Sequence, residues 1–192
     1  MKSGGPVRVK PARRPGLQRN GVVGMDKMDR VFAPWRMEYI LNNSDNNEKK
    51  GSGCIFCDFP KEDEDEKRLI VHRGKFCFVI LNAFPYNPGH LMVVPYRHTN
   101  DLPGLAPEEL GEMMATVQTA VAVLKKVMDP QGFNIGMNLG KVAGAGIDQH
   151  LHIHVVPRWN GDTNFMPVLG GVRVVSEALQ NTWRRVKEQW PQ

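Results

Sequence analysis

The 192-residue sequence contains no apolar run near the roughly 20 residues that a membrane-spanning helix requires. Its amino-terminal segment lacks the apolar centre of a secretory signal, so we expect a cytoplasmic protein with no membrane partner. Cysteine is scarce: three residues are too few for a disulfide scaffold and fit a reducing compartment better. The length favours one globular domain with extensions, long enough to bury a core.

The formal charge of +5 is unevenly distributed. Residues 1–24 contain six Lys or Arg residues and no acidic residue, so the rest of the chain is near −1. A nucleic-acid footprint would lie on the folded domain, whereas this charge belongs to a Gly/Pro-rich tail. We therefore expect a disordered basic tail over residues 1–24, a domain with helical extensions at both ends over residues 25–192, and no nucleic-acid partner.

Runs rich in β-forming residues predict three strands, over residues 76–81, 90–95 and 133–138. The turn residues Asn87-Pro-Gly connect the first two, which indicates an antiparallel meander. The acidic run 62–66 is interpreted as a solvated loop.

Helices are predicted in three places. Apolar residues spaced at three and four favour a helix over residues 108–128, whose methionines we expect in the core. A helix is expected after Ser176, a good N-cap, and a short one opens at Trp35, after Pro34. Helices packed on a largely antiparallel sheet define an α+β fold class.

The most informative stretch holds half of the six histidines. His150, His152 and His154 alternate with apolar residues from Leu151 to Val155. This period of two is typical of a strand, which would line one face with three imidazoles close enough to share one phosphate or a metal. The alternatives are an edge strand with solvated histidines and a metal-binding patch that arose by chance.

This stretch, with the segments 87–97 and 157–165, resembles the histidine triad (HIT) superfamily of nucleotidyl hydrolases and transferases. The resemblance covers about residues 31–190 and is strongest to the bacterial diadenosine tetraphosphate phosphorylases, also called ATP adenylyltransferases. It implies a HIT-like fold, a homodimer, and a nucleotide and inorganic phosphate as substrates, with ADP and ATP as products.

The resemblance also implies roles for the triad. His152 would attack the α-phosphorus to form a nucleotidyl-histidine, with its other ring nitrogen held by a backbone carbonyl. His154 would hold the phosphate oxygens, and His150 completes the catalytic set. A neutral imidazole is a competent nucleophile near pH 7, and the scheme needs no redox cofactor and no metal at the phosphorus.

Asn82, His90 and Asn138 match family positions at the substrate site. Further candidates for substrate contact are the loop residues Gly144, Ala145 and Gly146, where glycines allow backbone amides to approach an anion, and Trp159, directly beyond the triad strand. Many relatives carry Ser, Thr or Gln before the triad, where this chain has Ala145-Gly146, so backbone amides alone are expected to assist the leaving group. Trp159 has packing as its alternative role.

A Cys-x-x-Cys pair, Cys54 and Cys57, precedes the domain core. By itself it fits a redox pair, two buried thiols or metal ligands. In relatives with this pair, a histidine after the second strand of the hairpin and the first triad histidine complete a metal site. Here those positions are His98 and His150, so the resemblance implies a structural zinc with Cys₂His₂ ligands.

Two other functions stay open at this point. One is a HIT hydrolase that cleaves dinucleoside polyphosphates or nucleoside phosphoramidates with water. The other is a nucleotide-binding regulator without turnover.

Overall fold

The computed structural model describes residues 53–162 and 177–191. The expected basic tail, the helix at Trp35 and the Ser176 N-cap lie outside these residues. In the described part, no helix combines the length and apolarity needed to cross a membrane.

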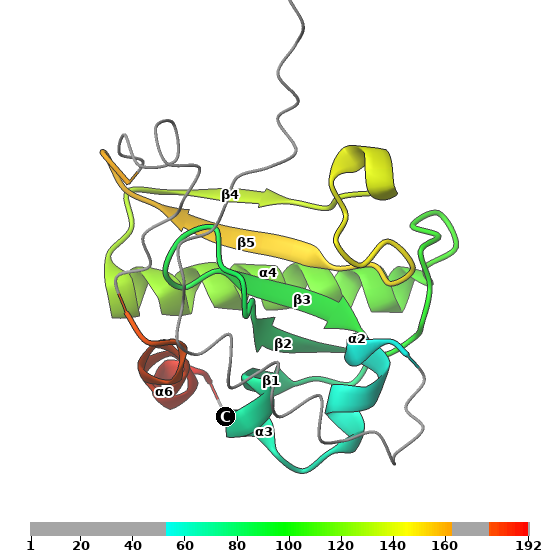
Figure 1. Cartoon of the computed structure of the whole chain (residues 1–192), viewed down its shortest axis with the longest axis horizontal. Helices are drawn as coiled ribbons and strands as arrows, with labels where there is room; N and C mark the ends of the chain where they lie inside the picture. The colour runs from blue at the N-terminus through cyan, green and yellow to red at the C-terminus, as the bar shows by residue number, and fades with distance from the viewer. Residues whose placement is uncertain (1–52, 163–176, 192) are drawn as a thin grey trace, which may run out of the picture.

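One antiparallel sheet of five strands organises the described chain (Figure 1). Its strand order is β1-β2-β3-β5-β4. The strands are β1 (Ile70–Arg73), β2 (Cys77–Leu81), β3 (Leu91–Pro95), β4 (Gly132–Gly136) and β5 (Ile153–Arg158). The predicted meander is the β2–β3 pair, and the α+β class is confirmed. β1 was not predicted, because it is short and follows a run of charged residues.

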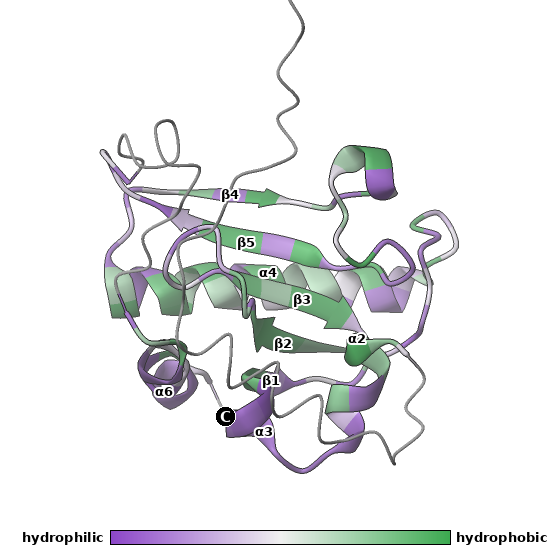
Figure 2. Ribbon diagram, viewed as in Figure 1, coloured by the Kyte–Doolittle hydropathy of each residue, from purple (hydrophilic) through white to green (hydrophobic). Residues whose placement is uncertain are grey.

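Two helices pack against the sheet. The long helix α4 (Pro107–Met128) crosses one face, and α6 (Leu179–Gln189) packs beside β1 (Figure 1). The central strands β2 and β3 are mostly hydrophobic, β5 carries a hydrophilic band between hydrophobic ones, and α6 is largely hydrophilic (Figure 2). Trp183 of α6 donates its indole N–H to Ile70 O at 2.9 Å, which covers part of the edge strand β1.

The expectation that all helical methionines lie in the core was wrong for one of them. Met113 of α4 is fully buried, whereas Met114 is 47% exposed and Leu110 is also exposed. Neighbouring helical positions differ by about 100° around the axis, so the face that meets the sheet covers only one of the two methionines.

Short elements precede β1. They are α2 (Ile55–Asp58), the 3₁₀ turn η1 (Phe59–Lys61) and α3 (Asp65–Arg68), and a second 3₁₀ turn, η2 (Lys141–Ala143), lies before β5. The predicted acidic loop is therefore partly helical, since Asp65 and Glu66 open α3.

The turn between β2 and β3 depends on a glycine. Gly89 has φ +76, and a Cβ there would lie 2.5 Å from the Met128 sulfur. Only glycine meets both demands at this position, which brings the end of α4 against the turn.

Candidate active site

Strand register puts the last triad histidine in a row with two apolar side chains. Met92 of β3 pairs with His154 of β5 on one side and with Ile80 of β2 on the other. Because side chains alternate between faces, this row lies on the face opposite the one that carries Val93 and Ile153. All three side chains line a pocket of about 860 Å³, and His152 lines it beside His154.

The sequence predicted that all three triad histidines lie in one strand. The structure places only the last of them in it. β5 begins at Ile153, so His150 and His152 precede it. The ladder with β3 ends at the pair Val93–Ile153, and two positions further on Pro95, which has no N–H, would face Leu151. The Leu151 N–H donates instead to Thr99 O at 2.7 Å.

The His152 ring is oriented by the backbone. Its Nδ1 lies 2.9 Å from His150 O, and because a carbonyl oxygen only accepts, Nδ1 carries the proton. Nε2 is then left with its lone pair. Burial lowers the pKa of His152, an effect that this hydrogen bond opposes. A neutral ring with an unprotonated Nε2 is the form that a nucleophile requires.

A second chain of contacts fixes the His154 ring. The Tyr86 N–H donates to His90 Nδ1 at 3.1 Å, so neutral His90 carries its proton on Nε2. His90 Nε2 lies 2.9 Å from His154 Nδ1 and donates to it. His154 therefore carries its proton on Nε2. The centroids of the His154 and His152 rings are 4.7 Å apart. Burial lowers the pKa of His154 to about 4, so this donor is neutral at physiological pH.

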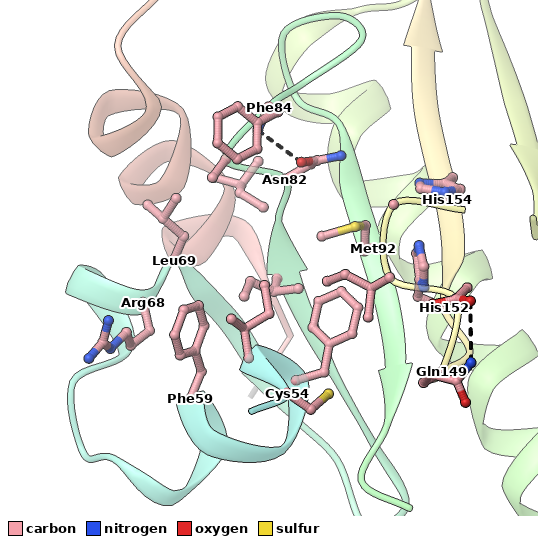
Figure 3. A pocket seen from close by; sticks show the side chains of 18 of the residues that line it. Cys54, Phe59, Arg68, Leu69, Asn82, Phe84, Met92, Gln149, His152 and His154 are labelled. Atoms are coloured by element: carbon pink, nitrogen blue, oxygen red, sulfur yellow. Dashed lines mark hydrogen bonds between the residues drawn. The ribbon is translucent and has the colours of Figure 1, made fainter. Parts of the chain in front are cut away.

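Two asparagines flank these rings. Asn82 accepts the Phe84 N–H at 2.9 Å through Oδ1, and its Nδ2 lies 3.4 Å from His90 Nδ1 (Figure 3). The Asn138 amide lies 3.4 Å from His154 Nε2. Since that nitrogen is a donor, the amide oxygen of Asn138 is its natural partner once the amide is rotated.

The loop before the triad presents part of its backbone to the pocket. The Gly144 N–H donates to Lys141 O at 2.9 Å and the Ala145 N–H to Gly140 O at 3.4 Å. Within the described chain, the Gly146 N–H has no acceptor, and Gly146 lines the pocket.

The remaining candidates lie around the pocket or away from it. Asn82, Gly144 and Gly146 line it, while His90 and Asn138 reach it through His154. Ala145 and Trp159 are not part of its lining, and Trp159 follows the opposite end of β5. Their proposed substrate contacts stay predictions.

Four side chains gather beside the triad as a Cys/His cluster. Cys54, Cys57, His98 and His150 offer ligand atoms that lie within 4.8 Å of one another. His150 Nδ1 is 3.3 Å from Cys54 Sγ and 3.3 Å from His98 Nδ1. Tetrahedral zinc with Zn–N near 2.0 Å and Zn–S near 2.3 Å separates its ligands by about 3.3–3.8 Å, so the set fits.

The outer contacts of the Cys/His cluster also suit a metal. The His150 Nε2 donates to Pro95 O at 2.8 Å, which leaves Nδ1 as the ligand atom. Phe56, between the two cysteines, packs its ring 5.5 Å from His150 and 5.2 Å from His152. Sequence reasoning missed Phe56, because an apolar residue within a Cys-x-x-Cys pair carries no signal of its own.

Comparison with known proteins places the chain in a family. The HIT domain family model matches residues 63–161, and the chain belongs to the HIT family. The chain is 43% identical over 173 residues to the AP-4-A phosphorylase of Mycobacterium tuberculosis, across 88% of both chains. It is 33% identical over 93 residues to the asymmetrical bis(5'-nucleosyl)-tetraphosphatase of Schizosaccharomyces pombe, across 48% of this chain and 50% of that protein.

A solved structure gives the same family. A Zn-bound histidine triad family protein from Mycobacterium smegmatis matches with a TM-score of 0.59 at 28% identity. The match covers 72% of this chain and 93% of that chain. The resemblance inferred from the sequence is therefore confirmed.

Proposed function

We propose that this protein is a diadenosine tetraphosphate phosphorylase, which uses inorganic phosphate to produce ADP and ATP. The observation that carries this proposal is the His152 ring, held by His150 O with Nε2 unprotonated in a pocket beside a neutral His154 donor. The likeness to AP-4-A phosphorylase across most of both chains supports the substrate.

The reaction divides into two displacements at one phosphorus. His152 Nε2 forms a bond to the α-phosphorus, and the bond to the bridging oxygen breaks and releases ATP. An oxygen of inorganic phosphate then attacks the same phosphorus, which breaks the P–N bond and releases ADP. Each step passes through a five-coordinate transition state in which the non-bridging oxygens of the phosphorus gain negative charge. The His154 Nε2–H donates a hydrogen bond to these oxygens.

The leaving ATP needs its own donor. Ala145-Gly146 provides no side-chain donor at the position where many relatives have one, and the Gly146 N–H is a backbone group of that loop with no acceptor in the described chain, at a residue that lines the pocket. We assign it to the leaving phosphate chain, with glycine permitting close approach of the anion.

Zinc completes the proposal at the Cys/His cluster. The four residues would hold it as a closed structural site, which ties α2 to the segment before β5. The metal supplies folding energy there and takes no part at the phosphorus.

The protein is further proposed to be a cytoplasmic homodimer. Within the described sheet, β4 pairs only with β5, and Ile135 on this edge is 47% exposed. An open edge with an apolar side chain favours pairing with a second copy. Light scattering of Ile135→Glu should give a monomer, and Met114→Glu, with equal exposure on α4, should not.

One assay separates this function from its competitors. The full chain is incubated with diadenosine tetraphosphate with and without inorganic phosphate, and the products are resolved by chromatography. Phosphate-dependent ADP supports the phosphorylase, whereas AMP formed without phosphate makes the protein a hydrolase. Nucleotide binding with no product under either condition makes it a regulator.

A further inference from the structure

One side of the Cys/His cluster faces the substrate pocket. Cys54 lines the pocket together with His152, and Figure 3 draws the Cys54 sulfur there. His98 of the same cluster lines it as well. Cys54 and Cys57 are both only partly buried. A small solute that enters the pocket therefore reaches a thiol of the cluster.

The two cysteines of the cluster occupy one helical turn. Cys54 is the N-cap of α2, and the Cys57 N–H donates to Cys54 O at 3.0 Å. Their sulfur atoms lie within 4.8 Å of each other. A disulfide has an S–S bond of about 2.05 Å and Cβ atoms about 3.5–4.5 Å apart, so a small shift of this short helix and its side chains brings the sulfurs into bonding distance.

The third cysteine of the chain is placed differently. Cys77 of β2 is fully buried, and burial raises the pKa of its thiol to about 11. Oxidants attack the thiolate, and access to Cys77 is blocked, so this residue should stay inert.

Two contacts link the cysteine pair to the nucleophile. Phe56, between the two cysteines, is buried, and its ring centroid lies 5.2 Å from that of His152. His150 Nδ1 lies 3.3 Å from Cys54 Sγ, and His150 O accepts the Nδ1–H of His152 at 2.9 Å. Drawing the two sulfurs together shifts Phe56 and the Cys54–His150 contact. The His152 ring then loses part of what holds it.

We propose that Cys54 and Cys57 form a redox switch, in which a peroxide joins them in a disulfide and thereby lowers the reactivity of His152. The inference rests on the proposed function for the role of His152 and adds a modification site beside it. The disulfide also removes two of the four ligands of the Cys/His cluster, so bound zinc is released.

The oxidation balances with hydrogen peroxide as the oxidant. The Cys54 sulfur attacks one peroxide oxygen, the O–O bond breaks, and a sulfenic acid and one water molecule form. The Cys57 sulfur then attacks the Cys54 sulfur, which breaks the S–O bond and releases a second water. Two thiols and one peroxide thus give one disulfide and two waters, and a thiol reductant reverses the change.

The test treats the full chain, loaded with zinc, with hydrogen peroxide and examines the cysteines and His152 separately. Mass spectrometry should find the protein lighter by two hydrogen atoms, with the disulfide mapped to Cys54 and Cys57, and a chromogenic chelator should detect released zinc. The rate at which diethyl pyrocarbonate modifies His152 should fall at least about tenfold, since small misplacements of a reacting group have effects of this size. Dithiothreitol with added zinc should restore this rate.

Two variants and one ligand complete the experiment. Cys77→Ala is the matched control, because it removes a cysteine and leaves the pair, and it should respond as the wild type does. Cys54→Ala should form no disulfide and show no reversible loss of His152 modification. AMP, which covers Cys54 when it fills the pocket, should slow disulfide formation in the wild type, a measurement that holds even if Cys54→Ala does not fold.

Three results overturn the switch. A mass that peroxide leaves unchanged, or oxidation of Cys77 in place of the pair, removes the modification site. A mapped disulfide with an unchanged rate of His152 modification separates the pair from the nucleophile. Failure of the proposed function is distinct, because it appears as the absence of phosphate-dependent ADP from untreated protein, while the disulfide and the modification of His152 are still measured.

Discussion

The His152 Nδ1–H donates to the backbone carbonyl of His150 at 2.9 Å, and the His150 ring belongs to the Cys/His cluster. The residue that orients the nucleophile is thus also a candidate metal ligand. The side chain of His150 is the candidate ligand and its backbone carbonyl fixes the His152 tautomer, so we expect metal binding and reactivity to be coupled through this residue.

Removing one ligand of the Cys/His cluster tests that coupling. His98→Ala should lose bound zinc and at least about 2 kcal/mol of unfolding free energy, since structural zinc supplies folding energy. It should lower kcat more than it raises KM, because the His152 ring is less well held. Metal analysis, denaturant unfolding and steady-state kinetics give the three readouts.

Cys77→Ala is the control for that variant. Cys77 is buried on β2, where its thiol contacts Thr116 and burial raises its pKa to about 11. It lies outside the Cys/His cluster, so the variant should keep its zinc. Full zinc content in His98→Ala would remove His98 from the ligand set.

Acid should destabilise the fold through His154. Its pKa is about 4 in the folded protein and near 6.5 when unfolded, so the unfolded chain binds more protons between these values. The free energy of unfolding should fall as the pH drops from about 6.5 to 4. His154→Gln should show a smaller drop, by on the order of 1 kcal/mol after allowance for partial solvation. An identical pH dependence in both proteins would contradict the assignment.

Asp162 should stabilise the far end of β5. Its carboxylate accepts from Arg158 Nε at 2.6 Å, from Asn87 Nδ2 at 2.7 Å and from the Trp159 N–H at 3.1 Å. Asp162→Ala should therefore lower the unfolding free energy by about 2 kcal/mol, as lost charge-assisted hydrogen bonds do.

The same contacts give this loss a pH dependence. Hydrogen bonding to Arg158 holds the pKa of Asp162 well below its usual range, so its contribution is present above about pH 4 and lost as the pH falls further. Asp63→Asn, at an exposed carboxylate, is the control and should change stability little. Equal stability of the two variants at pH 7 would show that the network has little effect.

Local sequence patterns predicted much of the fold. The helix over 107–128 follows from apolar spacing, and the β2–β3 hairpin from two β-rich runs around a Pro-Gly turn. Both depend on residues close in sequence. The late start of β5 was not predictable from its alternation, because it depends on Pro95, which lies more than fifty residues away and has no N–H.

The candidate site likewise has features that neighbouring residues predict and features that depend on residues far away in the sequence. The triad histidines stand out as neighbours, but the donor state of His154 is decided by His90, 64 residues away, and by a backbone amide at Tyr86.

The central claim is that His152 carries the nucleotide, and intact-protein mass spectrometry tests it most directly. The wild-type chain is mixed with diadenosine tetraphosphate without phosphate and quenched without acid, which hydrolyses phosphoramidates. The mass should rise by one adenylyl group, located on His152 by fragmentation, and His152→Asn should show no adduct and at least a thousandfold lower turnover. Turnover of His152→Asn at the wild-type rate, or an adduct on another residue, would contradict the account.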